Sequence, residues 1–136
     1  RPHVILTHDP WRRYNLHPDH RAVGWACCDA LVAARNASYY PEQLERSAPW
    51  RPSELLLFMP VEVNHVVDIT SQIDGKVAAV LCHASQLAGW AARAEPPRGE
   101  PADAVRGRVL QQAVAAAADR NFAYGEAVHR LVLRGE

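Results

Sequence analysis

One stretch near the start of the chain sets the fold, Thr7-His8-Asp9-Pro10 and then Tyr14-Asn15-Leu16-His17-Pro18-Asp19-His20. It gathers three histidines and two aspartates into a short segment. Neutral imidazole and carboxylate are ligands that zinc prefers, and both groups also transfer protons in hydrolases. A buried core gains little from so many polar side chains, so the stretch predicts a metal site or an acid–base site.

The residues on either side predict a strand followed by a helix. Val4-Ile5-Leu6 is a short apolar run typical of a buried strand, and Pro10 and Pro18 exclude a continuous element through the loop. From Asp19 or His20 onward the sequence favours a helix to residue 34, apolar nearly all round and expected to be buried on several sides, with Asp19 as its cap. Open α/β sheets keep ligand sites at such junctions.

Composition limits the classes of function. The chain has 136 residues, 49% of them hydrophobic, which is enough for one domain with a core. Lys and Arg total 15 and balance 15 Asp and Glu, so no net charge favours nucleic acid or an anionic membrane. The sequence has no apolar run of membrane-spanning length and opens on no signal-peptide pattern, which predicts a cytoplasmic protein. Its three cysteines lack the spacing of a disulfide framework or a cysteine–zinc cluster.

Further strands and helices are predicted along the rest of the chain. Trp50 is predicted to pack over the core edge, with a place in a substrate cleft as the alternative. A long connection over 36–53 with a short helix near 42–46 is expected to lead to strands at 54–59 and 65–68. A helix should then run from Thr70 or Ser71 to about residue 87, followed by a flexible exposed loop over 94–103. The last expected elements are an alanine-rich helix from 105 to about 119, capped by Asp103, and a strand or short helix over 124–133.

The histidine stretch resembles a signature of the PIG-L / LmbE-like family, zinc-dependent deacetylases of N-acetylglucosamine-type sugars. The resemblance rests on His17-Pro18-Asp19-His20 after the Thr-His-Asp-Pro turn. Later matches follow in family order, namely Val67-Asp68-Ile69-Thr70, Ile73 to Val80 with Lys76, His83-Ala84-Ser85-Gln86 and, more weakly, Tyr124-Gly125-Glu126-Ala127. The resemblance implies an α/β class and a Rossmann-like deacetylase fold, with a mostly parallel sheet flanked by helices.

The family's first signature, a His-Pro-Asp-Asp after the first strand, is absent from this sequence. By resemblance, residues 1–136 are therefore expected to form the C-terminal part of a single deacetylase domain. The missing N-terminal half is then a partner of this chain, separated from it by proteolysis, by trimming or by an interruption.

The resemblance also implies residue roles around a Zn²⁺ ion. His20 is expected to be a metal ligand, with the other ligands and the general base in the absent signature. His17 is expected to stabilise the tetrahedral intermediate or to protonate the departing amine, and Asp19 to hold the His17 ring in one tautomer. Tyr14 is a candidate to donate its hydroxyl to the oxyanion.

Several alternatives stay open at these positions. Tyr124, Arg12 or Arg13 would replace Tyr14 as the oxyanion donor. His8 and Asp9 are predicted to be turn formers at the strand end, with a supporting role behind the zinc ligands as the alternative.

The predicted function is a metal-dependent hydrolase that removes an N-acyl (acetyl) group from a glucosamine-containing substrate. The partner would be a small-molecule amino-sugar conjugate, such as a glycoconjugate, a thiol-cofactor precursor or a glycosylated natural product. The alternative is a non-catalytic half-domain or sugar-binding module without a complete metal site. A phosphoester hydrolase is a third class, but it would need more carboxylates to hold two metals. The sequence leaves oligomer formation open.

Overall fold

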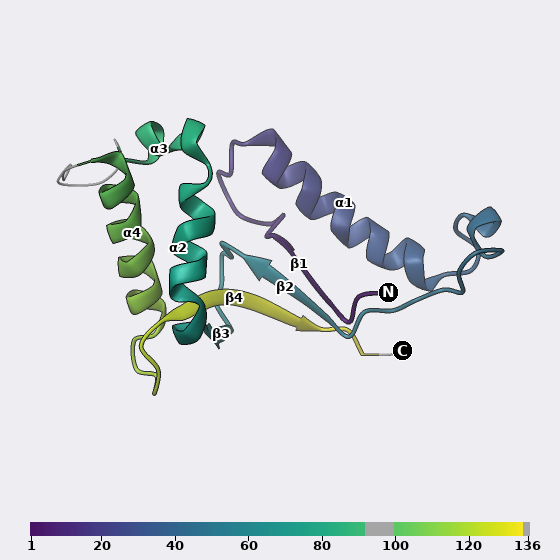
Figure 1. Cartoon of the computed structure of the whole chain (residues 1–136). Helices are drawn as coiled ribbons and strands as arrows, with labels where there is room; N and C mark the ends of the chain where they lie inside the picture. The colour runs from purple at the N-terminus through teal and green to yellow at the C-terminus, as the bar shows by residue number, and fades with distance from the viewer. Residues whose placement is uncertain (92–99, 135–136) are drawn as a thin grey trace. The chain divides into compact units, whose positions relative to one another are not determined.

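The computed structural model describes residues 1–91 and 100–134 (Figure 1). These residues form two compact units, and each is described by itself: unit 1 comprises Arg1–His65 with Ala127–Glu136, and unit 2 comprises Val66–Glu126. Most of the loop predicted over 94–103 lies outside the described residues. Its last three positions instead begin helix α4 (Pro101–Ala116), which starts four residues before the predicted helix with Glu100 as its N-cap.

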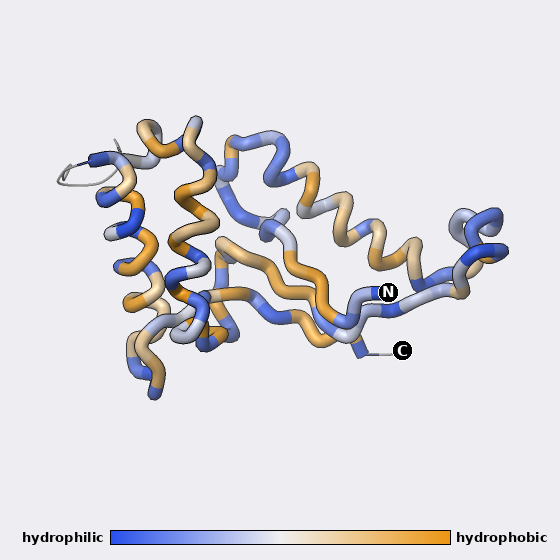
Figure 2. Tube along the Cα trace, viewed as in Figure 1, coloured by the Kyte–Doolittle hydropathy of each residue, from blue (hydrophilic) through white to orange (hydrophobic). Residues whose placement is uncertain are grey.

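Unit 1 is built on parallel strands β1 (Val4–His8) and β2 (Glu54–Phe58), both predicted from their apolar runs. The pair is in register, with Leu6 opposite Leu56, and β4 (Gly125–Val132) runs antiparallel to β2. Leu55 and Leu57 point to one buried face of β2, with 2% of each exposed, because alternate strand residues face opposite sides. Figure 2 shows the apolar character of β1 and β2 along most of their length.

Helix α1 (Pro18–Arg35) packs against β1, but its first turn differs from the prediction. His17 is the N-cap and Pro18 is the first helical residue, so Asp19 lies inside the first turn and does not cap the helix. Proline is favoured at this position because its fixed φ suits a helix and its missing N–H needs no partner there. A carboxylate in the first turn complements the helix dipole.

Helix α1 was expected to be buried on several sides by something further than this chain, and the residues that the structure describes cover only one of its sides. Only Gly24 is buried in this helix. Val23, Trp25 and Val32 are 44–49% exposed, because one face of α1 contacts the strand and the others carry uncovered apolar side chains.

Unit 2 holds most of β3 (His65–Asp68), a 3₁₀ turn at Thr70–Gln72, α2 (Ile73–Leu81), α3 (Ala84–Ala91) and α4. The single helix predicted from Thr70 to about residue 87 is thus divided into a 3₁₀ turn and two helices. The core of the unit forms where Ile73 and Val77 of α2 meet Val109 and Ala113 of α4.

Within unit 1 the strands are ordered β1-β2-β4. The described residues combine strands with helices, which confirms the α/β class, while the antiparallel pairing of β4 with β2 makes the sheet mixed. An antiparallel strand on an otherwise parallel sheet is common in α/β folds. None of the helices in the described part of the chain has the length and apolar character needed to cross a bilayer.

Candidate functional site

The candidate site lies in unit 1, where β1 ends and α1 begins. His8 is the last residue of β1 and sits opposite Phe58, the last residue of β2. His17 caps α1, and His20 follows within its first turn. The ends of two parallel strands and the start of a helix thus converge here, which is the usual position of a ligand site in an α/β sheet.

Three imidazole rings form a stack at this junction, here called the histidine stack: His8, His20 and His17. The ring of His20 lies in the middle, with its centroid 4.0 Å from that of His8 and 4.3 Å from that of His17. The ring planes are 14° and 15° apart, so the three rings are nearly parallel. Phe58 contacts His8 at 4.2 Å between centroids. Sequence reasoning linked His17 with His20 but predicted a turn-forming role for His8, whose side chain instead joins the stack.

The parallel arrangement limits how the stack can bind a metal. An imidazole nitrogen offers its lone pair in the plane of the ring, so nearly parallel rings cannot direct two lone pairs at one ion. Among residues 1–91 and 100–134, no group of three or more His, Cys, Asp or Glu is arranged to hold a metal. The arrangement therefore offers a single imidazole to an ion, and His20 alone does not make a complete site.

The environment of His8 favours its neutral form. Partial burial lowers its pKa below the ordinary histidine value, and the neighbouring charges that His20, His17 and Arg12 can carry lower it further. A neutral ring stacks on other imidazoles without adding charge repulsion, which is consistent with its position at one end of the stack.

Asp9 holds the loops behind the stack together. It is buried, with 6% exposed, and its Oδ1 accepts a hydrogen bond from the backbone N–H of Trp11 at 2.9 Å. Its Oδ2 accepts one from the backbone N–H of Val61 at 2.8 Å, which ties the loop after β1 to the loop after β2. Both carboxylate oxygens therefore accept backbone hydrogen bonds, in agreement with the predicted turn-forming role.

The other predicted site residues are exposed or are bonded to the backbone. Tyr14 is 92% exposed and has a positive φ of 57°. Asp19 is exposed in the first turn of α1. Arg12, an alternative oxyanion donor, donates instead to the backbone carbonyl of Met59 at 3.2 Å. The roles of Tyr14 and Asp19 remain predictions.

Gly24 brings α1 close to the end of β1. A Cβ atom added at this position would lie 2.8 Å from the carbonyl oxygen of His8 and 3.0 Å from Cβ of Pro10. Both neighbours are atoms that cannot rotate away, so only glycine permits this approach. Sequence reasoning missed this role, although a glycine inside an apolar helix is itself a signal of close packing.

The later family-like segments meet each other in unit 2. The Asp68-Ile69-Thr70 turn is closed by a 2.9 Å bond from the Thr70 N–H to Oδ1 of Asp68. Hydrogen bonding from the Thr70 side chain, and then from its backbone N–H, lowers the pKa of the Asp68 carboxyl. Ile69 donates to the carbonyl of Tyr124 at 3.0 Å, and Lys76 of α2 forms an ion pair with Glu126 of β4. These segments therefore fix one another and give unit 2 its shape.

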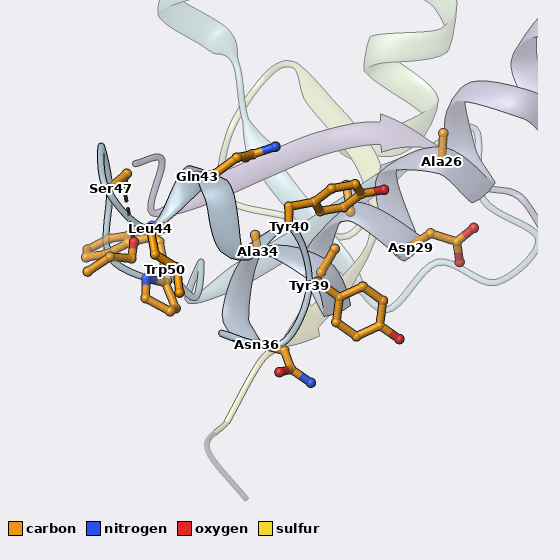
Figure 3. A pocket seen from close by; sticks show the side chains of 14 residues that line it. Ala26, Asp29, Ala34, Asn36, Tyr39, Tyr40, Gln43, Leu44, Ser47 and Trp50 are labelled. Atoms are coloured by element: carbon orange, nitrogen blue, oxygen red, sulfur yellow. Dashed lines mark hydrogen bonds between the residues drawn. The ribbon is translucent and has the colours of Figure 1, made fainter.

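A cavity of about 650 Å³ lies elsewhere in unit 1, between α1 and the segment 36–50 (Figure 3). No histidine lines it, and it is separate from the histidine stack. Trp50 is one of its lining residues and donates from Nε1 to the backbone carbonyl of Pro2 at 2.7 Å.

No family model matches the sequence. Curated relatives match it over about 63–64% of its length. A diacetylchitobiose deacetylase of Thermococcus kodakarensis is 31% identical over 88 residues, and a 1D-myo-inositol 2-acetamido-2-deoxy-alpha-D-glucopyranoside deacetylase of Gordonia bronchialis is 33% identical over 110 residues. The corresponding Rhodococcus jostii deacetylase is 31% identical over 115 residues. The matched part spans only 33–39% of these relatives.

Solved structures share the fold over nearly the whole chain. The N,N'-diacetylchitobiose deacetylase of Pyrococcus horikoshii aligns with a TM-score of 0.74 at 22% identity, covering 96% of this chain and 46% of that protein. The conserved protein TT1542 of Thermus thermophilus aligns with a TM-score of 0.71 at 22% identity, covering 100% of this chain and 55% of that one. The solved structures thus share the fold of this chain, and the curated relatives are deacetylases that it resembles over about a third of their length, in agreement with the resemblance of the His-Pro-Asp-His signature and the later motifs to the PIG-L / LmbE-like family.

Proposed function

We propose that this chain forms part of a hydrolase that removes the acetyl group from an N-acetylated glucosamine unit of a small sugar conjugate. The histidine stack, at the carboxyl ends of two parallel strands, is the single observation that carries the proposal. The relatives support the substrate class, since their names describe deacetylases of diacetylchitobiose and of an acetamido-glucopyranoside.

We further propose zinc as the metal and His20 as one of its ligands. The rings of His8 and His17 cover both faces of the His20 ring and so restrain its orientation. The described residues hold no group of three metal-binding side chains, so the remaining ligands would lie outside these residues, as the resemblance to the family also implies. Bound zinc would supply a water of lowered pKa, near 7, and would polarise the amide carbonyl.

His17 is the proposed catalytic acid. It is exposed at the start of α1 and lies against His20, so a substrate held near His20 is within its reach. Its imidazolium would donate a proton to the departing amine or a hydrogen bond to the oxyanion of the tetrahedral intermediate. Asp19 would hold the His17 ring in one tautomer, and Tyr14 would assist at the oxyanion once substrate covers its exposed ring.

The test uses a preparation that joins this chain with the polypeptide that completes the metal site. His20→Ala is expected to lose both zinc and acetate release from an N-acetylglucosaminide. His17→Ala is expected to keep zinc and to lose turnover by at least about 100-fold, the usual effect of removing a general acid. His65→Ala, outside the stack, is the matched control and should keep both. Normal turnover in His17→Ala, or full activity after the metal is stripped, would contradict the proposal.

The chain without further polypeptide is proposed to act as a sugar-binding module that does not turn substrate over. The described residues offer a single imidazole, that of His20, to a metal ion, which favours this state. Acetate release by the 136-residue chain on its own, with zinc added, would contradict this second proposal while leaving the first in place.

A further inference from the structure

The segment 36–50 is a loop whose two ends meet on α1. The backbone N–H of Trp50 donates to the carbonyl of Ala34 at 2.8 Å, and that of Asn36 donates to Ala33 at 3.2 Å. Turns inside the segment are closed by bonds from Tyr39 to Asn36 at 3.1 Å and from Gln43 to Tyr40 at 2.9 Å, all between backbone groups. Such compact surface loops are frequently functional. This one encloses the 650 Å³ cavity against α1.

Small side chains of α1 make room for the cavity, while aromatic rings form its wall. Ala30 and Ala33 are among the alanines that line the helix side. Tyr39 and Tyr40 are 50% and 58% exposed, so much of each ring remains available to a ligand. Tyr40 has a left-handed backbone, with φ of 50° and ψ of 55°, a conformation that costs a non-glycine residue free energy and that concentrates at functional sites.

The polar lining residues give the cavity a definite chemistry. Asp29 lines the cavity from α1, and Figure 3 shows its carboxylate projecting outward from the helix, on the same side of the view as the Tyr40 hydroxyl. Asn36 and Gln43 add side-chain amides to the lining. Flat aromatic faces pack against the apolar C–H face of a sugar ring, amides and hydroxyls bond to its hydroxyl groups, and a carboxylate pairs with a cation. The volume lies in the range of about 300–1,000 Å³ that is usual for small-molecule sites.

We propose that this cavity is a second binding site, specific for an amino-sugar residue that carries a free amino group. The choice of an amino sugar rests on the proposed function, whose product has such a group. The ammonium would pair with Asp29 and the sugar ring would pack against Tyr39 and Tyr40. An N-acetylated sugar has no charge at this position, so it binds without the contribution of Asp29.

The two sites are separated along α1. Ala30 follows His20 by ten residues, which corresponds to about 15 Å along the helix axis. A sugar in the cavity therefore leaves the histidine stack free, and binding at the two places can be measured separately.

The experiment is an NMR titration of the ¹⁵N-labelled 136-residue chain with a chitosan tetrasaccharide and, separately, with its N-acetylated counterpart. The expected result is that amide signals of residues 26–50 shift with both ligands and that the free amine binds at least 5-fold more tightly. Asp29→Asn should abolish that preference while leaving the affinity for the acetylated sugar unchanged. Asp74→Asn, which removes an exposed aspartate from a helix of unit 2, is the matched control and should keep the preference.

Tyr39→Ala with Tyr40→Ala should weaken both ligands at least 10-fold. If that double variant does not fold, the Asp29→Asn comparison decides alone. The inference is overturned if the signals of residues 26–50 do not shift, if shifts are confined to the histidine stack, or if Asp29→Asn keeps the preference for the amine. This experiment measures binding and not turnover, so it tests the second site separately from the proposed function. If acetate is released but the amide signals of residues 26–50 do not shift, the second site is contradicted and the proposed function is not.

Discussion

The imidazole rings of His8 and His20 are stacked, with centroids 4.0 Å apart and planes 14° apart. One ring comes from the end of β1 and the other from the first turn of α1, so the contact joins the two elements at the candidate site. The contact is made by the aromatic face of His8, whose lowered pKa favours the neutral ring.

Replacing His8 by Ala should therefore destabilise the chain, whereas His8→Phe should largely preserve it. Loss of an aromatic pair costs about 1 kcal/mol beyond the buried area. We expect His8→Ala to lower the free energy of unfolding by at least that amount in urea titrations, and to shift the ring proton signals of His20. Equal losses in the Phe and Ala variants would argue against stacking as the role of His8.

Asp9→Ala should be more damaging than its position in a loop suggests. The substitution leaves the backbone N–H groups of Trp11 and Val61 without their acceptor, and a hydrogen bond to a charged group contributes about 1.5–3 kcal/mol. We expect a loss of about 3 kcal/mol or more in the free energy of unfolding, measured by chemical denaturation.

Asp19→Ala provides the comparison, since Asp19 is exposed and contributes through the helix dipole, worth about 0.3–1 kcal/mol. If Asp9→Ala and Asp19→Ala lowered the free energy of unfolding by the same small amount, the two backbone hydrogen bonds of Asp9 would contribute little to stability.

An ion pair across β2 and β4 predicts a specific dependence of stability on pH. Arg130 donates from Nε to Oε2 of Glu54 at 2.9 Å, and this hydrogen bond together with the charge of Arg130 lowers the pKa of Glu54. The folded chain thus favours ionised Glu54 more than the unfolded chain does. The resulting stabilisation is complete above the ordinary glutamate pKa of about 4.3, and it is lost as the pH falls through the lowered value.

Glu54→Gln should accordingly flatten part of the decline in stability below about pH 4.3, measured by urea unfolding at a series of pH values. Arg130→Gln should flatten the same part, and the double variant should add nothing further. Unchanged slopes in both single variants would show that the pair does not couple stability to pH.

Local signals in the sequence were sufficient for the main elements of unit 1. The β-branched run at Val4–Leu6 predicted β1, and the prolines predicted where α1 begins. Asp19 does not cap the helix, because Pro18 occupies the first helical position, which leaves His17 as the N-cap and places Asp19 inside the first turn.

Features that depend on tertiary contacts could not be predicted in this way. No glycine or proline marks the break between Leu81 and Ala84, where one predicted helix becomes two. The stacking of His8 on His20 requires that the end of β1 lie beside the start of α1, which no spacing along the chain encodes. The pairing of Lys76 with Glu126 is likewise formed between residues 50 positions apart.

Gly24→Ala tests whether close packing of α1 on β1 is required. In an open helix the change would stabilise by about 1 kcal/mol, because alanine has the higher helix propensity. Here the new methyl group would lie 2.8 Å from the backbone oxygen of His8, and forcing an extra carbon into a packed contact costs about 1–3 kcal/mol. We therefore expect no gain, and a net loss of up to about 2 kcal/mol in the free energy of unfolding.

Gly107→Ala is the matched control, because Gly107 also lies within a helix and a Cβ there would meet nothing within 4 Å. That variant should gain about 0.5–1 kcal/mol. If Gly24→Ala lowers the free energy of unfolding while Gly107→Ala raises it, the loss at Gly24 comes from the contact with His8. The ring signals of His20 should then shift in the Gly24→Ala variant as well. A gain at Gly24 equal to the gain at Gly107 would mean that α1 can move away from β1 freely, and that the histidine stack does not depend on this approach.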